Sequence, residues 1–191
     1  MRGRQRVVLP RGPRMNPFRV ASEAPTWRHV AVTLLQTAVF WTLFLLLLPW
    51  AIHAATTACG LAPTPFAGHR ATGVAVFVVA SALGLTSGLT MAVRGKGTPL
   101  PLATARELVV TGPYRHVRNP MAVAGIAQGI AVGLLLANWW VVAYALIGSV
   151  IWHIMLRPAE ERDLRQRFGA SFERYRSEIP LWLPRWRGYS Q

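Results

Sequence analysis

Long stretches without an acidic or basic side chain constrain the fold of this 191-residue chain more than any other feature. Arg70 is the only Asp, Glu, Lys or Arg between His29 and Ala92, and residues 121–156 contain none. An uncharged apolar run of about 18 residues or more can cross the ~30 Å hydrocarbon core of a membrane as a helix. The sequence therefore predicts four spans, at about residues 30–52, 72–93, 121–137 and 139–156.

Only Ala137-Asn138 connects the last two predicted spans, which must therefore form a tight antiparallel hairpin. We expect an all-α membrane protein with about four transmembrane helices, the last two in this hairpin, plus a C-terminal cytoplasmic interfacial helix. Residues 1–28 are expected to be an Arg-rich, disordered cytoplasmic arm, and residues 29–191 a single integral membrane domain. A secretory signal peptide fits less well, because the first apolar run is long and begins only after about 29 residues.

The net charge of +14 is spread unevenly along the chain. Nearly all basic side chains lie in residues 1–29, 94–120 and 157–191, which four spans would place on the same side of the membrane. By the positive-inside rule that side is the cytoplasm, so both termini are expected there. Orientation and attraction to lipid headgroups then explain the charge, which argues against a nucleic-acid partner.

Lys96 is the only lysine among the 21 basic residues, and this arginine bias points to a GC-rich genome. We therefore expect a multi-pass protein of the inner (cytoplasmic) membrane of a bacterium. The single cysteine, Cys59, excludes an internal disulfide.

Small residues recur every four positions in two of the predicted spans. Gly125, Gly129 and Gly133 form one such stripe, and Gly84 and Gly88 belong to another. Such stripes let helices pack closely in a membrane, and a second interpretation is that they leave room for the tail of a ligand. Two polar residues within the spans, Gln128 and His153, either bond neighbouring groups or touch a ligand.

The stretch TGPYRHVRNPM at residues 111–121 gathers polar and cationic groups just before the third span. Asn119 is a favoured N-cap and Pro120 suits the first helical position. The free N–H groups of this helix start, together with Arg118, favour an anionic ligand.

A second polar segment follows the fourth span, which Pro158 is expected to end. Glu160 and Glu161 suit the first turn of the next helix, and they also form a good site for an ammonium group or sugar hydroxyls. Because the last two spans form a hairpin, the two polar segments should be neighbours in space.

Aromatic residues follow at helical spacing, and then come two tryptophans. Phe168, Phe172 and Tyr175 predict an interfacial helix, and Trp182 and Trp186 an aromatic strap on the cytoplasmic leaflet that covers the site as a lid.

These residues together resemble the isoprenylcysteine carboxyl methyltransferase and phospholipid methyltransferase family of integral membrane enzymes. The family's usual motif has a His where this chain has Asn119 and a Tyr where it has Ala122. The second change removes an aromatic ring and a hydroxyl group from one wall of the family's binding pocket. The resemblance runs from about residue 95 to residue 185, through stretches 95–99, 108–115 and 118–121, Glu160-Glu161, Phe168-Gly169 with Tyr175, and Pro184-Arg185.

The resemblance implies a pocket for S-adenosylmethionine. It implies that Arg118 holds the methionine carboxylate and that Glu160 and Glu161 hold the ammonium or the ribose. The residues that it assigns to the cofactor are Tyr114, Arg118, Asn119, Pro120, Glu160 and Glu161.

The expected reaction is methyl transfer to a carboxylate of an isoprenoid-cysteine-like or other lipophilic acceptor that enters from the bilayer. Arg157 or Arg174 would orient that carboxylate. An alternative is a phospholipid or amine N-methyltransferase, in which His153 or a glutamate accepts a proton. A second alternative is a non-catalytic protein, or a nicotinamide-dependent reductase, on the same scaffold.

Overall fold

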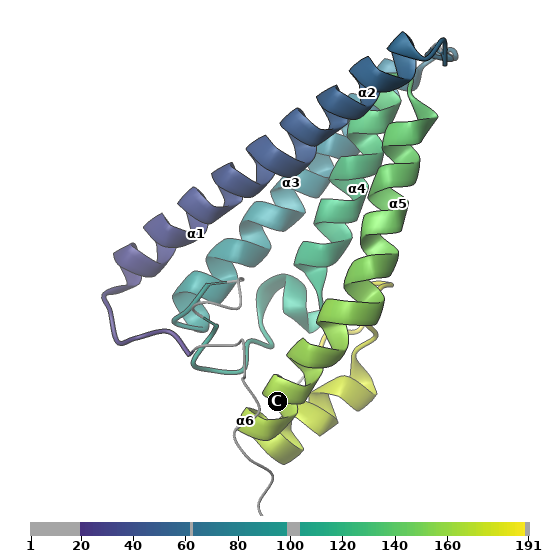
Figure 1. Ribbon diagram of the computed structural model, residues 1–191. Helices are drawn as coiled ribbons and strands as arrows, with labels where there is room; N and C mark the ends of the chain where they lie inside the picture. Colours follow the sequence, from purple (N-terminus) through teal and green to yellow (C-terminus); the bar gives the residue numbers. More distant parts are fainter. Residues whose placement is uncertain (1–19, 62, 99–103, 190–191) are drawn as a thin grey trace, which may run out of the picture.

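The computed structural model describes residues 20–61, 63–98 and 104–189. Within these ranges the chain is helical and has no β-strand, only an isolated bridge between Val20 and Thr104. Three helices run side by side and the first helical column crosses them obliquely (Figure 1). The elements are α1 Thr26–Phe40, η1 Trp41–Leu47, α2 Leu48–Ala58, α3 His69–Arg94, η3 Gly112–Arg115, α4 Pro120–Leu135, α5 Trp139–Ile151, η4 Trp152–Leu156 and α6 Arg157–Glu178. Residues 1–19 of the expected arm lie outside the described residues.

Two helical columns contain a proline that does not end them. The first runs through the π-helical turn η1 into α2 despite Pro49, and the last runs through the π-helical turn η4 into α6 despite Pro158. A proline removes a backbone donor, and its ring crowds the carbonyl four residues earlier. The π turns lengthen the local hydrogen bonds to five residues, as from the Arg157 N–H to the Trp152 carbonyl, and so make room for the ring. The expectation that Pro158 ends the fourth span is therefore wrong.

Among the residues that the structure describes, three columns are long and apolar enough to cross a membrane, namely Thr26–Ala58, His69–Arg94 and Trp139–Glu178. The chain is thus an all-α membrane protein, as the sequence predicts. α4 is shorter than the predicted third span, because its 16 residues reach only about 24 Å. It ends at Leu135 because Ala137 adopts a left-handed φ of 49° that reverses the chain.

The α4–α5 hairpin closes on two glycines and one asparagine. A Cβ at Gly133 would lie 2.5 Å from Val142 Cγ2, and one at Gly129 would lie 2.7 Å from Ala145 Cβ. The two helices can therefore approach this closely only because glycine has no side chain at either position. The Asn138 Oδ1 accepts from the Trp140 N–H at 2.9 Å and caps α5. The predicted tight hairpin and its packing stripe are confirmed at these positions.

Gly125 is the exception in the α4 stripe. It is exposed, and nothing lies within 4 Å of a Cβ built on it. The contact between α4 and α5 is therefore tight at the turn and absent at Gly125, near the start of α4.

α3 packs along α4 and also contacts α1. A Cβ at Gly84 would touch Ala124 Cβ at 3.3 Å, so the stripe on α3 also serves helix packing. Gln128 is buried and donates through Nε2 to Ser81 Oγ at 3.0 Å. Of the two interpretations of this intramembrane glutamine, the bond to a neighbouring helix is the one observed.

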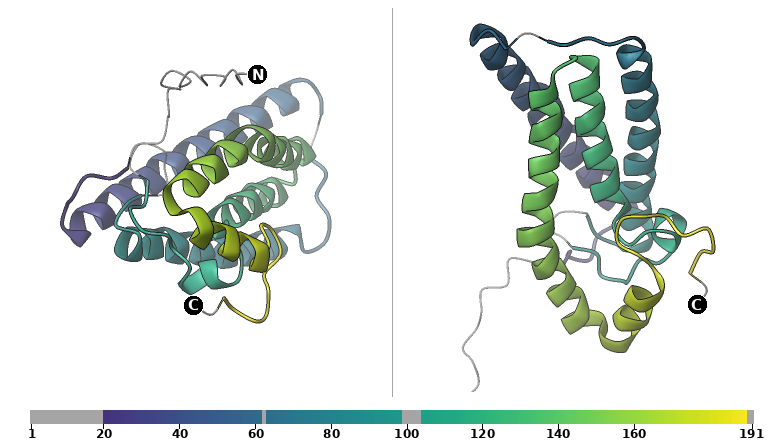
Figure 2. Two further views of the ribbon diagram at one scale, coloured as in Figure 1. Left: turned by 90° about the horizontal axis from the view of Figure 1, so that it is seen from below. Right: turned by 90° about the vertical axis from the view of Figure 1, so that its right-hand side faces the viewer.

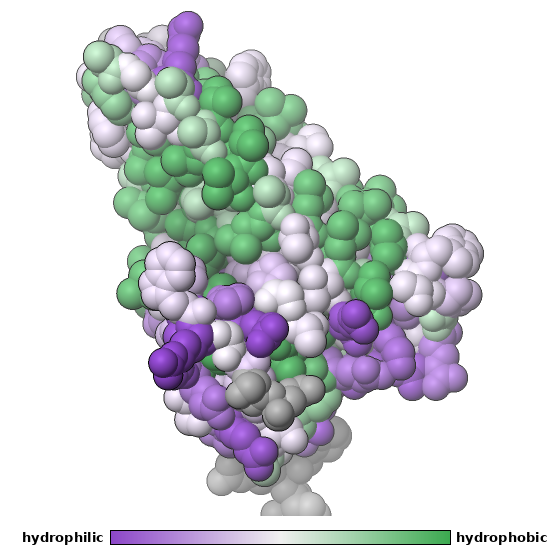
Figure 3. All heavy atoms as spheres, turned by 180° about the vertical axis from the view of Figure 1, so that it is seen from behind, coloured by the Kyte–Doolittle hydropathy of each residue, from purple (hydrophilic) through white to green (hydrophobic). Residues whose placement is uncertain are grey.

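Apolar and polar surfaces separate along the bundle. Figure 3 shows apolar side chains over the body of the bundle below its upper tip, and hydrophilic ones gathered toward the lower end, where α6 lies. Both described chain ends are at this end: the Ala21 N–H donates to the Thr104 carbonyl at 3.1 Å, and the Tyr189 N–H to the Arg115 carbonyl at 2.9 Å. The ends thus share one side of the bundle, and that this side is cytoplasmic stays a prediction.

α6 folds back on itself instead of running on as a straight interfacial helix. Gly169 has φ 49° and ψ −124°, a conformation that favours glycine, and the chain turns there (Figure 2). Phe172 and Tyr175 then pack against Val110 and Ile179 in a buried cluster. The predicted aromatic face exists, but it covers protein instead of lipid.

We expect Gly133→Ala to lower the stability of the protein by about 1–3 kcal/mol, because the added methyl group clashes with Val142 in a tightly packed contact. Gly125→Ala is the matched control. It should leave stability unchanged or raise it slightly, since its surroundings are open and alanine favours helix. Thermal unfolding in detergent measures both. Equal melting temperatures for the two variants would contradict the close approach.

Candidate functional site

The two polar segments meet at the lower end of the bundle through an ion pair. Arg118 Nη1 lies 3.1 Å from Glu161 Oε1, and the two side chains are only 13% and 15% exposed. Arg118 lies just before α4, and Glu161 is in the first turns of α6, so the pair joins segments 43 residues apart. The expectation that these segments are neighbours in space is confirmed.

Glu161 is the centre of an arginine cluster. Besides Arg118, Arg157 Nη1 lies 3.5 Å from Oε1 and Arg176 Nε lies 3.5 Å from Oε2. Three guanidinium groups thus share one carboxylate, which leaves it little capacity for another cation. The arrangement fits a carboxylate that positions arginines better than one that binds an ammonium group.

Arg118 keeps one donor unused. Its Nε is buried and has no hydrogen-bond partner among the described residues. Its backbone N–H donates to the Pro180 carbonyl at 2.9 Å, which holds the residue in place. A buried guanidinium N–H without a partner is unfavourable, and an anionic ligand would satisfy it.

Glu160 differs from its neighbour. Its side chain forms no hydrogen bond or ion pair with any residue that the structure describes. Burial, and secondarily the charge of Glu161, raises the pKa of Glu160 to about 7. Of the two glutamates, Glu160 is therefore the carboxyl group available to a ligand.

Tyr114 lies beside Glu160 and is buried. Its pKa is raised far above the ordinary value, first by burial and then by the charges of Tyr175 and Glu160. The Tyr175 hydroxyl donates to the Tyr114 carbonyl at 2.7 Å, so the second half of α6 holds the 112–118 loop.

Asn119 and Pro120 start α4 as predicted. The Asn119 Oδ1 accepts from the Ala122 N–H at 3.0 Å, and Pro120 is the first residue of the helix. The capping role of Asn119 is thus observed, and its contact with a cofactor stays a prediction.

The three residues assigned to catalysis lie in different surroundings. His153 Nδ1 is buried without a partner among the described residues, and its ring stacks on Trp182 with centroids 5.6 Å apart. Arg157 is engaged with Glu161. Arg174 is exposed and forms no ion pair within the described chain, so the structure does not bring it to the cluster.

The predicted strap is tied to the loop before α4. The Arg185 N–H donates to the His116 carbonyl at 2.8 Å, and His116 Nδ1 bonds the Arg185 carbonyl at the same distance. Trp182 covers His153, whereas Trp186 is completely exposed. One tryptophan of the strap therefore contacts the candidate site and the other does not.

Sequence reasoning missed two groups near the site. Arg176 reaches Glu161 only because the chain turns at Gly169, and no local pattern signals that contact. Asp163 is buried and pairs with Arg167 at 3.0 Å, and the i, i+4 spacing of this pair was visible in the sequence.

Comparison with known proteins identifies the family. Residues 69–171, more than half of the chain, match the phospholipid methyltransferase family. The chain belongs to this family.

Protein-S-isoprenylcysteine O-methyltransferase of Schizosaccharomyces pombe is similar to this chain, with 33% identity over 79 residues. These residues make up 40% of this chain and 33% of the yeast protein. The match thus spans only about a third of that curated relative. The family segment contains α3, α4, α5 and the Arg118–Glu161 pair, but not α1 or α2.

The raised pKa of Glu160 makes stability depend on pH. The folded protein keeps a proton on this carboxyl up to about pH 7. In the unfolded chain the pKa has its ordinary value of 4.5, so the proton is lost at a lower pH. Stability should therefore fall as the pH rises between about 4.5 and 7. Glu160→Gln should flatten this dependence, measured as melting temperatures at pH ~5 and ~8.

Glu178→Gln is the matched control for this measurement, because Glu178 is exposed and forms no ion pair within the described residues. It should keep the full pH dependence. If Glu160→Gln kept it as well, the carboxyl group would not titrate in the manner that its burial implies.

Proposed function

We propose that this protein transfers a methyl group from S-adenosylmethionine to a lipophilic acceptor at the cytoplasmic face of the membrane. The observation that carries the proposal is the buried Nε of Arg118, which has no hydrogen-bond partner among the described residues. Glu161 holds the same guanidinium through Nη1, and the adjacent Glu160 has a free carboxyl group. Membership of the phospholipid methyltransferase family supports the reaction class.

The residues present fit the methionine end of this cofactor. Its carboxylate would take the free Nε–H of Arg118, which lies just before α4. Its ammonium group or ribose hydroxyls would meet Glu160, which is ionised above about pH 7. Glu161 would act through Arg118 by fixing its guanidinium, and Tyr114 would shape the adjoining wall.

S-adenosylmethionine supplies an activated methyl group on a sulfonium, so the protein mainly has to align the two reactants and exclude water. Arg118 and Glu160 would fix the donor. Trp182, stacked on His153, would keep water from the acceptor side of the site. This division of roles needs no nucleophilic side chain.

Binding by titration calorimetry tests the donor site. Arg118→Lys should weaken the affinity for S-adenosylmethionine by about 10- to 100-fold, because lysine has no Nε–H in that position. Glu160→Gln should weaken it by about tenfold at pH ~8, where the wild-type carboxyl is ionised. NADPH should give no binding heat.

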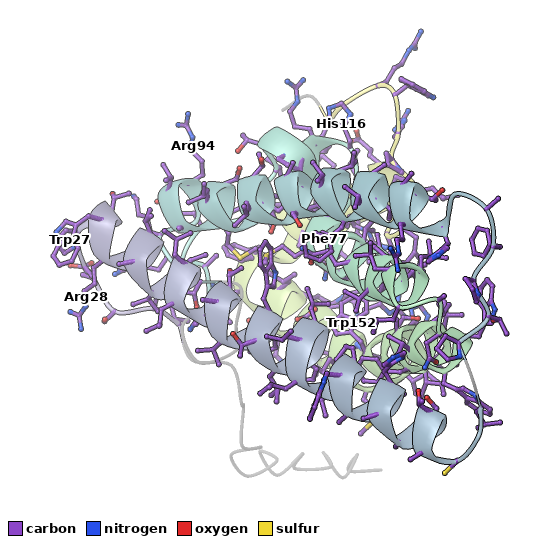
Figure 4. The ribbon with its side chains drawn as sticks, turned by 90° about the horizontal axis from the view of Figure 1, so that it is seen from above. Trp27, Arg28, Phe77, Arg94, His116 and Trp152 are labelled. Carbon is purple, nitrogen blue, oxygen red and sulfur yellow. The ribbon has the colours of Figure 1, made fainter. Side chains whose placement is uncertain are left out.

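Arg94→Gln is the control, because Arg94 points away from the bundle (Figure 4) and lies at the end of α3. It should bind the donor as the wild type does. Wild-type affinity in both site variants would show that the donor is bound elsewhere, and heat with NADPH alone would favour the reductase alternative.

A specific observation favours an amine acceptor as a second candidate. The sequence predicts that Arg157 or Arg174 orients a carboxylate acceptor. In the structure, however, Arg157 is paired with Glu161, and Arg174 is exposed. His153 Nδ1, by contrast, is buried without a partner among the described residues and could accept the proton that an amine nitrogen releases.

His153→Phe separates the two acceptors, because phenylalanine keeps the stacking on Trp182 and removes the nitrogen. Methyl transfer to hexadecylamine should fall by about 10²–10⁴-fold, while the affinity for S-adenosylmethionine stays unchanged. Transfer to hexadecanoate, measured in parallel with labelled methyl donor, serves as the control. An undiminished rate with the amine would remove His153 from the proposed mechanism.

A further inference from the structure

The inner face of α1 carries a polar stripe that helix packing does not explain. His29, Thr33 and Gln36 follow at spacings of four and three, which places them on one face of the helix. Thr33 is 2% exposed and His29 is 7% exposed. The Thr33 Oγ1 and Gln36 Oε1 are buried and have no hydrogen-bond partner in the part of the chain that the structure describes. Unsatisfied polar atoms at membrane depth are strongly unfavourable, so a partner is expected.

Polar groups on the helices opposite α1 are already in use. Ser87 is fully buried and donates to the Leu83 carbonyl at 2.6 Å. Gln128 donates to Ser81 at 3.0 Å. Neither group bonds Thr33 or Gln36, so a bound molecule can supply their missing hydrogen bonds.

Thr33 lies where three helices meet, at the depth of the donor site. A Cβ on Gly88 of α3 would lie 3.2 Å from Thr33 Cγ2 and 3.7 Å from Met121 Cε. Met121 is the second residue of α4 and follows Arg118 by three positions. The stripe therefore faces the helix start at which the methyl donor is proposed to bind.

An open apolar cavity of about 430 Å³ lies farther along the first column, toward the other end of the bundle. It is formed by the π turn η1 together with α3 and α4. Phe77 lies on the side of α3 that faces the first column and α4 (Figure 4). Trp41 follows Thr33 by eight residues, which is about 12 Å along a helix. The lining residues are Trp41, Thr42, Leu45, Leu46, Phe77, Val132, Leu135 and Leu136.

We propose that the stripe and this cavity form the acceptor site. The occupant is a single-chain amphiphile with an uncharged, hydrogen-bond-donating head, a hydroxyl or a neutral amine, at Thr33 and Gln36, and its hydrocarbon chain lies in the cavity. Gln36 Oε1 accepts from the head, and an ionised carboxylate finds neither lysine nor arginine in the stripe. The proposal rests on the proposed function and adds the class of acceptor.

α1 lies outside the segment matched by the family, which begins at residue 69. The acceptor is then selected by a part of the chain that family membership does not define. Thr33 and Gln36 determine specificity for the head, and the cavity around Trp41 and Phe77 determines it for the chain.

Binding of tritiated hexadecanol to the full-length protein, reconstituted in phosphatidylcholine nanodiscs, tests this site without any methyl donor. Thr33→Val and Gln36→Leu should each weaken the binding by about tenfold, the equivalent of one hydrogen bond. Both variants should unfold at the same temperature as the wild type or higher, because each removes an unsatisfied polar atom. Hexadecanoate should compete at least about tenfold less well than unlabelled hexadecanol.

Thr57→Val is the matched control, because Thr57 is exposed at the opposite end of the same helical column. It should bind hexadecanol as the wild type does. Leu135→Trp, which fills the cavity and leaves the stripe intact, should also weaken binding. Unchanged binding in both stripe variants, or equal competition by hexadecanoate, would overturn the proposal.

The outcome is independent of the donor site. If S-adenosylmethionine fails to bind in calorimetry while hexadecanol binding follows this pattern, the proposed reaction is wrong and the amphiphile site stands. If the donor binds and the stripe variants bind hexadecanol normally, the reaction stands and the acceptor site lies elsewhere.

Discussion

The shared carboxylate of Glu161 joins the two ends of the α4–α5 hairpin and holds the arginines around the proposed donor site. Arg118, which precedes α4, and Arg176, from the returning half of α6, both reach it. Three cations around one partly buried anion are stable only as a set, because removal of the anion leaves like charges together in a poorly solvated place. The geometry of the free Arg118 Nε and of the neighbouring Glu160 follows from this cluster.

A π-helical turn and a left-handed glycine in the last helical column determine where these charges come together. Pro158 lies within a continuous column because η4 widens the hydrogen bonds before it, so α6 leaves the bundle without a break. The chain turns at Gly169, and Tyr175 comes back to bond the Tyr114 carbonyl. A straight α6 would have carried Arg176 and Tyr175 away from the loop before α4.

The proposed enzyme divides its work between two parts of the chain. The family segment supplies the hairpin and the charged cluster, which suit a methyl donor that many acceptors can share. The first column, outside that segment, supplies unsatisfied polar atoms and an apolar cavity, which suit one kind of acceptor. Sequence change in α1 could then alter the acceptor and leave the donor site unaffected.

The sequence by itself determined the membrane class, the tight hairpin, the Asn119 cap and the proximity of Arg118 to the paired glutamates, because these depend on apolar length, turn residues and chain connectivity. It gave Glu160 and Glu161 the same role, and it could not foresee the length of α4, the continuity through Pro158 or the return of Arg176. Those were decided by the tertiary structure, since a π turn and one left-handed residue at Ala137 or Gly169 redirect whole helices. Which carboxylate is saturated and which is free depends on distances between segments that are far apart in the chain, and no local pattern encodes them.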